Sequence, residues 1–480
     1  MTNQHSELLS LAAEHAIDYL DGIAERPVAA TADTDWLTTL LGGRLPEGPA
    51  SAADTIDVLN RAASEGGVVA SSGPRYFGYI VGGTLPVSIA ADWLVSTWDQ
   101  NNSVFELGPA VATIEQVTAQ WLIELFGLPD TTSVGFPTGC AMAHMTALAA
   151  ARHHVLAQAG WHVERAGLRL APRVDVVVGA QRHLTVDLAL HYLGFGTEPV
   201  HVVPVDDQGA MRVDALANVL ATCDGPIIVC TQAGDVNSGA VDPLRKICRL
   251  VHQHGGWVHV DGALGLWAAA NPRLRSLVEG FADADSCASD AHKWLNVPYD
   301  CGLVFVAHPQ AHRAAMLNVR ADYLPGATLG KRDGIEWVPD FSRRARSVPV
   351  WAALRTLGRS GVANLIEASC ACAGRFAERL AEIPGVEVLN KVVLNQVLVR
   401  FGDDDEATNE VIDRLQAGGV CWFGGTTWAA LAAMRISVCS WRTSIADVDR
   451  CVEEIRAAAE AVLGERRYGA GTWKPVSSHS

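Results

Sequence analysis

The 480-residue sequence lacks the segments that mark membrane and secreted proteins. No uninterrupted apolar run is long enough to span a bilayer, and the polar start from Met1 to Glu7 lacks a basic segment followed by an apolar one, so we expect no signal peptide. Basic residues are also scarce, because 37 Lys and Arg face 53 Asp and Glu and give a formal charge of −16. This balance argues against binding to nucleic acid or to an anionic membrane surface.

Paired cysteine motifs are absent as well. Eleven cysteines are scattered through mostly apolar runs, and no pair has the spacing of a zinc knuckle. We therefore expect small buried side chains in a reducing, cytoplasmic compartment and predict no metal site. The composition, 49% hydrophobic and 19% charged, is that of an ordinary globular protein with length for two or three domains.

One lysine stands in a sequence context that suggests chemistry. Lys293 follows His292 and a stretch of mostly small residues, and it precedes the strand-like run from Gly302 to Val306. Burial would disfavour its ammonium form, and a neutral amine is a nucleophile toward aldehydes. The cofactor that most often uses such an amine is pyridoxal phosphate, held as a Schiff base. The alternative is a structural lysine whose amine reaches solvent.

Two upstream stretches favour the cofactor. The run from Gly256 to Ala263 is typical of a buried strand that ends in an acid, Asp261, which needs a cationic partner such as a protonated pyridine nitrogen. The run from Phe136 to Met145 is a turn of small residues that leads into an alanine-rich helix. Free backbone N–H groups at a helix N-terminus would suit a phosphate.

The chain alternates helical and strand patterns over most of its length. Short β-branched runs at 174–179, 200–205, 226–231 and 257–261 are separated by helix-length segments, which indicates a mostly parallel sheet covered on both faces. We predict an α/β fold with a helical N-terminal arm and substrate-bordering segment (1–89), a large cofactor-binding domain (90–349), a smaller C-terminal α/β domain (350–468) and a disordered tail (469–480). Ligands bind at the carboxyl ends of such strands, so Thr231, Asp261 and the loop before Lys293 should converge.

An ordered set of motifs resembles a known family. These are Pro74 to Tyr79, Gly108-Pro109-Ala110 with Glu115, the turn at Thr138, the segment around His183, Thr231 to Pro243, Asp261, Asp290-Ala291-His292-Lys293-Trp294 and Arg435 to Val438. In this order they resemble the group II pyridoxal-phosphate-dependent amino-acid decarboxylases, the family of aromatic-L-amino-acid, histidine and glutamate decarboxylases. The resemblance implies fold type I, the aspartate aminotransferase-like fold of pyridoxal-phosphate-dependent transferases, and a homodimer with shared active sites.

The resemblance also implies roles for individual residues. His183 would stack on the pyridine ring, and Tyr323 would return a proton to the substrate carbon after carbon dioxide leaves. The cofactor contacts implied are Thr138, Gly139, Cys140, Asn237, Asp261, Ala263, His292 and Lys293. Candidate substrate contacts are Phe77, Tyr79, Ile80, Phe105 and Arg435, although for Arg435 a structural ion pair is slightly favoured over a substrate carboxylate.

These features predict decarboxylation of an L-amino acid to an amine and carbon dioxide, with the cofactor on Lys293. One alternative keeps the cofactor but changes the reaction to aldehyde-forming oxidative deamination, carbon–carbon lysis or transamination. A more remote alternative is a pyridoxal-phosphate-binding protein without catalysis. The identity of the amino acid is not readable, because an aromatic cluster such as Tyr76 to Tyr79 suits aromatic and branched aliphatic side chains alike.

Overall fold

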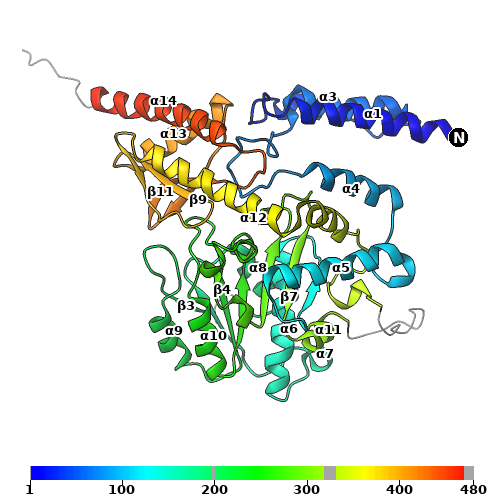
Figure 1. The fold of residues 1–480 in the computed structure, drawn as a ribbon, viewed down its shortest axis with the longest axis vertical. Helices are drawn as coiled ribbons and strands as arrows, with labels where there is room; N and C mark the ends of the chain where they lie inside the picture. Colours follow the sequence, from blue (N-terminus) through cyan, green and yellow to red (C-terminus); the bar gives the residue numbers. More distant parts are fainter. Residues whose placement is uncertain (1, 197–199, 318–330, 470–480) are drawn as a thin grey trace, which may run out of the picture. The chain divides into compact units, whose positions relative to one another are not determined.

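The computed structural model of the chain describes residues 2–196, 200–317 and 331–469 (Figure 1). The chain forms two compact units. Unit 1 contains the residues up to Gly83, Gly374–Leu389 and the residues from Leu398 on, and unit 2 contains Thr84–Ala373 and Asn390–Val397. The domain boundaries predicted from the sequence stay predictions, since a compact unit need not be an independently folding domain.

Unit 2 is built on a seven-stranded sheet with the order β1-β7-β6-β5-β4-β2-β3. Strands β2 to β6 run parallel to one another, whereas β7 pairs antiparallel with both β6 and β1. The strands are β1 (Ser133–Gly135), β2 (Asp175–Gly179), β3 (Val200–Val203), β4 (Ile227–Gln232), β5 (Trp257–Asp261), β6 (Ser286–Asp290) and β7 (Gly302–Val306). The predicted α/β architecture with a mostly parallel central sheet is confirmed.

The strands form where apolar runs are buried on both faces. In β2 the residues Val176 to Val178 are at most 2% exposed, as a sheet covered on both sides requires. Sequence reasoning missed β6, whose residues Ser286 to Asp290 include no β-branched or aromatic side chain. Small side chains fit there because β6 lies in the middle of the sheet, between β5 and β7.

The long helix α6 covers the face of the sheet that carries the candidate site. Successive side chains of a strand point to opposite faces, so Trp257, His259 and Asp261 of β5 share one face. The imidazole of His144, in α6, lies 2.8 Å from that of His259, which identifies this face as the one under α6. The helices that begin in unit 2 are α4 (Pro86–Trp98), α5 (Pro109–Phe126), α6 (Cys140–Gln158), α7 (Val163–Ala166), α8 (Leu184–Tyr192), α9 (Val213–Leu220), α10 (Leu244–Gln253), α11 (Pro309–Met316) and α12 (Ser347–Leu380).

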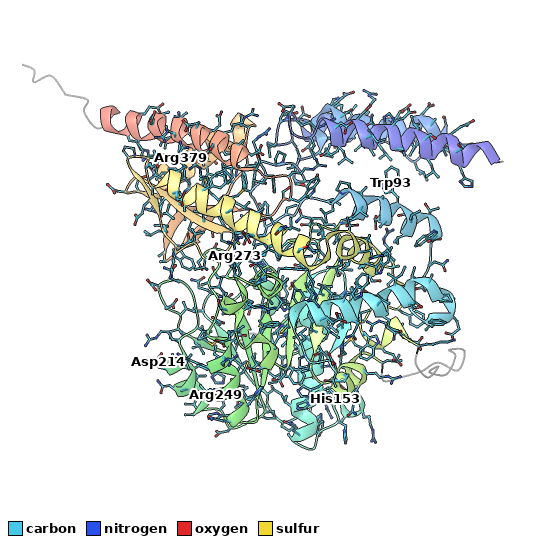
Figure 2. The ribbon with its side chains drawn as sticks, viewed as in Figure 1. Trp93, His153, Asp214, Arg249, Arg273 and Arg379 are labelled. Atoms are coloured by element: carbon cyan, nitrogen blue, oxygen red, sulfur yellow. The ribbon has the colours of Figure 1, made fainter. Side chains whose placement is uncertain are left out.

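Helix α10 shows how the outer helices separate their polar and apolar sides. Its buried side chains are Leu244, Ile247, Cys248 and Val251, at the spacing of one helical face, and the helix packs against β5. Arg249 on α10 and Asp214 on the neighbouring α9 are exposed (Figure 2). Among the described residues, we find no helix that combines the length and the apolar composition needed to cross a bilayer.

Unit 1 combines N-terminal helices with a second, four-stranded sheet of order β10-β11-β9-β8. Asp33, Ser51 and Asp404 begin their helices by accepting hydrogen bonds from backbone N–H groups of the first turn. The helices are α1 (Thr2–Asp21), α2 (Thr34–Leu41), α3 (Ala52–Ala62), α13 (Asp405–Gly418) and α14 (Ile445–Gly469), and the strands are β8 (Val386–Val388), β9 (Gln396–Phe401), β10 (Gly424–Trp428) and β11 (Leu431–Ser437). Residues 470–480 lie outside the described residues, so the disordered tail stays a prediction.

Candidate active site

The amine of Lys293 forms an ion pair with the acid three residues before it. Lys293 follows the end of β6, and its Nζ lies 3.0 Å from Oδ2 of Asp290, the last residue of that strand. The Lys293 side chain is 18% exposed and that of Asp290 only 3%. Burial alone would lower the pKa of Lys293, but the nearby carboxylate outweighs burial and holds this pKa above its usual value.

The expectation that burial leaves Lys293 neutral is therefore wrong, because the carboxylate of Asp290 outweighs the effect of burial. The sequence context gave the burial correctly but not the carboxylate partner. Because Asp290 stabilises the ammonium form, the amine must give up a proton before it attacks an aldehyde. The ion pair also fixes the direction of a long, flexible side chain.

Asp261 is a buried carboxylate at the carboxyl end of β5. It is 7% exposed, its Oδ1 accepts a hydrogen bond from the N–H of Ala263 at 3.1 Å, and its Oδ2 lies 3.4 Å from Nε2 of His144. Burial raises the pKa of this carboxyl group. The imidazoles of His144 and His183 and the N–H of Ala263 lower the pKa by more than burial raises it, so Asp261 stays ionised. The sequence predicted the buried acid but not its partner His144.

Behind Asp261 runs a chain of buried hydrogen bonds. Nδ1 of His144 lies 2.8 Å from Nε2 of His259, Nδ1 of His259 lies 2.9 Å from Oγ of Ser286, and that oxygen accepts from Nε1 of Trp257 at 2.9 Å. Tryptophan can only donate and an ionised carboxylate can only accept. The carboxylate end therefore receives the Nε2–H of His144, whereas the Ser286 hydroxyl, which can donate once and accept twice, can complete the chain in either direction. Burial lowers the pKa of His259 to about 3, which agrees with a neutral ring.

The predicted phosphate cradle is a turn held against the start of β7. Thr138 and Gly139 precede α6, which begins at Cys140, and the N–H of Gly302 donates to the carbonyl of Pro137 at 2.8 Å. A Cβ added to Gly302 would lie 2.6 to 2.8 Å from backbone atoms of Gly139, so glycine is required for this approach. His292 borders the same turn, because its Cε1 would lie 3.5 Å from a Cβ on Gly139.

His183, Thr231 and Asp261 line one pocket at the carboxyl ends of β2, β4 and β5. The predicted convergence of Thr231 and Asp261 is thus confirmed. His183 caps α8, and its Nδ1 lies 2.7 Å from Oγ1 of Thr185. Asn237 is buried in the turn after β4, where its N–H donates to Oδ1 of Asp235 at 2.8 Å.

The remaining candidates are divided between the units. Tyr323 lies outside the described residues. Phe105 belongs to unit 2, where its N–H donates to Oδ1 of Asp333 at 3.0 Å. The other four candidates for substrate contact belong to unit 1.

Within unit 1, Phe77 is fully buried against Phe376 and Phe423, whereas Tyr79 is 69% exposed and stacks on Trp422. Two further candidates from this unit are the 2% exposed Ile80 and Arg435 of β11.

Sequence reasoning missed Asp290 and His144, although both carried a detectable signal. Asp290 stands three residues before Lys293, within side-chain reach. His144 stands four residues after Cys140, on the same helical face, and His259 stands two residues before Asp261, on the same face of its strand. Only the tertiary structure shows that these two faces meet.

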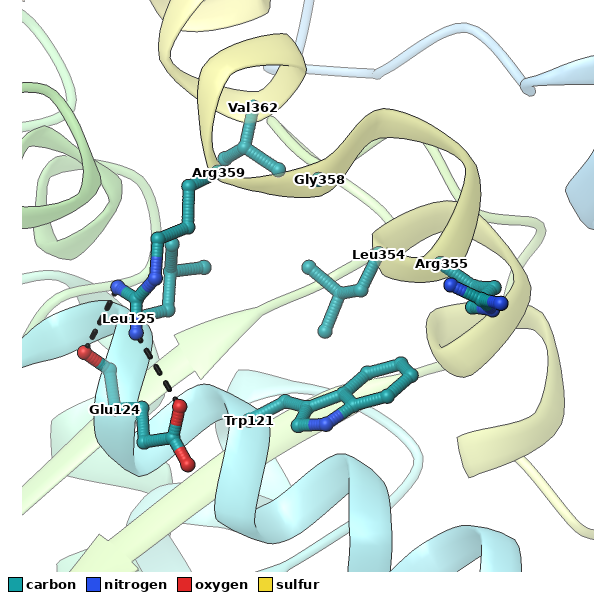
Figure 3. Close-up of a pocket in the computed structure, with 8 residues that line it drawn as sticks. All are labelled: Trp121, Glu124, Leu125, Leu354, Arg355, Gly358, Arg359 and Val362. Carbon is teal, nitrogen blue, oxygen red and sulfur yellow. Dashed lines mark hydrogen bonds and ion pairs between the residues drawn. The ribbon is translucent and has the colours of Figure 1, made fainter.

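A separate surface pocket of about 250 Å³ lies between α5 and α12 (Figure 3). Trp121 and Leu125 line it from α5, and Leu354 and Val362 line it from α12, on either side of the break at Gly358. None of the predicted site residues that the structure describes lines this pocket. It is therefore distinct from the cluster around Lys293.

Comparison with known proteins identifies the family and the fold. The pyridoxal-dependent decarboxylase conserved domain matches residues 44–401. An aromatic-L-amino-acid decarboxylase of Bacillus atrophaeus is 25% identical over 466 residues, covering 94% of both chains, and a 4-hydroxyphenylacetaldehyde synthase of Rhodiola rosea is 22% identical over 475 residues, also covering 94% of each. The crystal structure of Oryza sativa TDC with PLP and tryptamine superposes with a TM-score of 0.90 at 22% identity, covering 96% of this chain and 99% of the other, so the fold is that of the fold type I enzymes. The chain belongs to the pyridoxal-dependent decarboxylase family, whose cofactor is pyridoxal phosphate and whose members are carboxy-lyases.

Proposed function

We propose that the protein decarboxylates an L-amino acid to the corresponding amine and carbon dioxide, with the cofactor attached to Lys293. The observation that carries this proposal is the presence of two chemical groups at the ends of adjacent strands. Lys293, with its primary amine, follows β6, and Asp261, a buried and ionised carboxylate, ends β5. The family supplies the reaction class, and these two residues supply the chemical groups that the class needs.

The donor set fits pyridoxal phosphate. A primary amine is available for the aldehyde, an anionic carboxylate for the pyridine nitrogen, and a helix N-terminus with free backbone N–H groups for the phosphate. The glycine contact between Gly302 and Gly139 keeps that N-terminus free of side-chain bulk. When bound, the cofactor supplies an electron sink for the pair left behind as carbon dioxide departs.

The side chains then have distinct tasks. Asp261, kept anionic by His144, would hold a proton on the pyridine nitrogen. His183 would lie on the face of the cofactor ring. Lys293 would release the product by forming its own covalent bond to the cofactor again. The phosphate would be held by Thr138, the N–H groups of Gly139 and Cys140, and His292, with Ala263 and Asn237 as further cofactor contacts.

Tyr323 is the proposed proton donor to the substrate carbon. A decarboxylase needs a proton there, whereas an aldehyde-forming enzyme diverts the same carbon into oxidation. We therefore propose simple decarboxylation, although the relatives include a 4-hydroxyphenylacetaldehyde synthase. Phe77, Tyr79, Ile80, Phe105 and Arg435 stay proposals for the substrate side of the site.

The test is an absorbance spectrum followed by a screen of L-amino acids for carbon dioxide release. The matched variants are Lys293→Ala and Lys246→Ala, since Lys246 is an exposed lysine on α10. We expect a visible cofactor band and release of carbon dioxide and amine in equal amounts from one amino acid, both retained in Lys246→Ala and lost in Lys293→Ala.

Other outcomes are equally informative. Aldehyde, ammonia and peroxide in place of amine would replace the proposal with oxidative deamination, and a keto acid would indicate transamination. A cofactor band without turnover of any amino acid would indicate a binding protein. A band that survives in Lys293→Ala would overturn the assignment of the lysine.

We also propose a cytoplasmic homodimer in which each active site takes residues from both subunits. The test of shared sites is complementation between inactive variants. Tyr323→Phe and Lys293→Ala homodimers should each be inactive, and mixing them after mild dissociation should restore up to about a quarter of the activity in the statistical limit if the two residues act across the interface. No recovery in verified heterodimers would contradict shared sites.

A further inference from the structure

A second group of chemically active side chains lies in unit 2, away from the candidate active site. Asp175 opens β2, His201 lies in β3, and Cys223 lies in the turn between α9 and β4. Asp175 and the turn with Cys223 stand at the amino-terminal ends of parallel strands, whereas His183, Asp261 and Lys293 follow carboxyl-terminal ends. The group and the proposed cofactor site therefore lie at opposite ends of the strands.

Three potential ligand atoms converge at this edge. Oδ1 of Asp175 lies 3.2 Å from Nε2 of His201, and the Sγ of Cys223 completes a set whose atoms all lie within 4.8 Å of one another. The N–H of Gly225 donates to Oδ2 of Asp175 at 3.0 Å, which leaves Oδ1 directed toward the other two residues. Asp175 is 7% exposed, so this carboxylate is held rather than mobile.

A thiolate, an imidazole and a carboxylate are ligands that zinc accepts, with bonds of about 2.0 to 2.3 Å. Around a tetrahedral ion such ligand atoms lie about 3.3 to 3.6 Å apart by this geometry. The aspartate and histidine atoms already have nearly that separation, and a shift of up to about 1.5 Å in the Cys223 side chain would complete the set. The two anionic ligands would neutralise a divalent cation.

The group also opens to solvent. Asp175 and His201 line a surface pocket together with Arg173, Thr222 and Asp224, the residues that flank two of the ligands. Three protein ligands beside an open space give the arrangement in which a water or a small anion takes the fourth zinc position. Arg173, whose Nε lies 3.7 Å from Oδ1 of Asp175, is 67% exposed and can turn outward when a cation binds.

We propose that Asp175, His201 and Cys223 bind a zinc ion with one solvent-facing position at the amino-terminal edge of the unit 2 sheet. The ion would join β2, β3 and the turn before β4. Sequence analysis predicted no metal site because the three ligands come from separate elements and form no short motif. A purely structural role for the Asp175–His201 contact, as a cross-strand pair, is the competing explanation.

Cobalt(II) added to the chelator-treated, cofactor-loaded protein tests the proposal, because its thiolate charge-transfer band reports cysteine ligation directly. We expect one ion per chain, displaced by zinc, with the band lost in Cys223→Ser and stoichiometric binding lost in both Cys223→Ser and His201→Gln. Retained cofactor absorbance shows that each variant is folded.

The control is Cys140→Ser, because Cys140, His144 and Asp261 are the other described residues whose ligand atoms lie within the same distance of one another. The cobalt band should persist in Cys140→Ser. No thiolate band in the unmodified protein, a band that survives in Cys223→Ser, or a band lost in Cys140→Ser would each overturn the proposal.

Discussion

Glu115 should be among the most costly carboxylates to neutralise in unit 2. It is 1% exposed in α5, and both its oxygens lie 2.7 Å from Nη2 of Arg343. Nε of Arg332 donates to Oε1 at 2.9 Å, and Nδ2 of Asn102 donates to Oε2 at 2.7 Å. Burial raises the pKa of Glu115, but the two guanidinium groups outweigh it and hold this pKa below its usual value.

Glu115→Gln preserves size and removes the charge. The cluster of one carboxylate and two guanidinium groups carries a net charge of +1, and the substitution leaves two buried cations with no anion between them. Its amide NH2 also cannot accept the hydrogen bonds that it replaces. Removing one partner from a buried ion pair typically costs about 3–5 kcal/mol, so we expect a loss of this size in the free energy of unfolding.

The control is Glu124→Gln in the same helix. Oε2 of Glu124 lies 3.3 Å from Nη2 of Arg359 at the pocket between α5 and α12 (Figure 3), and the two side chains are 50% and 63% exposed. An exposed pair contributes about 0–1 kcal/mol. Urea unfolding of both variants, followed by tryptophan fluorescence and by loss of the cofactor band, measures the difference. Equal unfolding midpoints for the two variants would refute the reasoning from burial.

Three further predictions concern the site and its support. Asp290→Asn removes the carboxylate that raises the pKa of Lys293, so the neutral amine should form at lower pH in the variant. The rate of cofactor incorporation into the cofactor-free protein should therefore begin to rise at a lower pH than in the parent protein, and an unchanged pH profile would contradict this. Gly302→Ala should lose about 1–3 kcal/mol of stability and release its cofactor faster, because the added Cβ would meet backbone at 2.6 Å, whereas Gly464→Ala, with open space at its Cβ, should change neither adversely; dialysis and urea unfolding decide. The pKa of Asp285 is lowered to about 2 by two histidines despite burial, so this group stabilises the fold above about pH 4 and loses that effect as pH falls toward 2; Asp285→Asn should cost about 2 kcal/mol at neutral pH, and a gap to the parent protein that stays constant down to pH 2 would argue against it.

The sequence allowed more of the fold to be predicted than of the site's electrostatics. Strands such as β5 were predicted at their observed bounds because β-branched residues in a covered sheet leave a continuous apolar run. β6 escaped detection because a strand in the middle of a sheet can be made of small polar residues when both faces are covered. Asp290 and His144 stand at suggestive spacings, but their effect on the protonation of Lys293 and Asp261 could not be assigned, since it depends on distances that periodicity does not contain.

Helix α6 begins at the proposed phosphate cradle and, one turn later, places His144 against Asp261. These two points are four residues apart on a rigid rod, a rise of about 6 Å. The spacing between the anchor for one end of a flat ligand and the support for its other end is therefore built into the helix repeat. Insertions in the turn before Cys140 would shift both points together, whereas an insertion or a kink within the first turn of α6 would alter the spacing itself. Selection on the length of this single turn would act at once on how firmly a ligand is held and on how its ring is polarised.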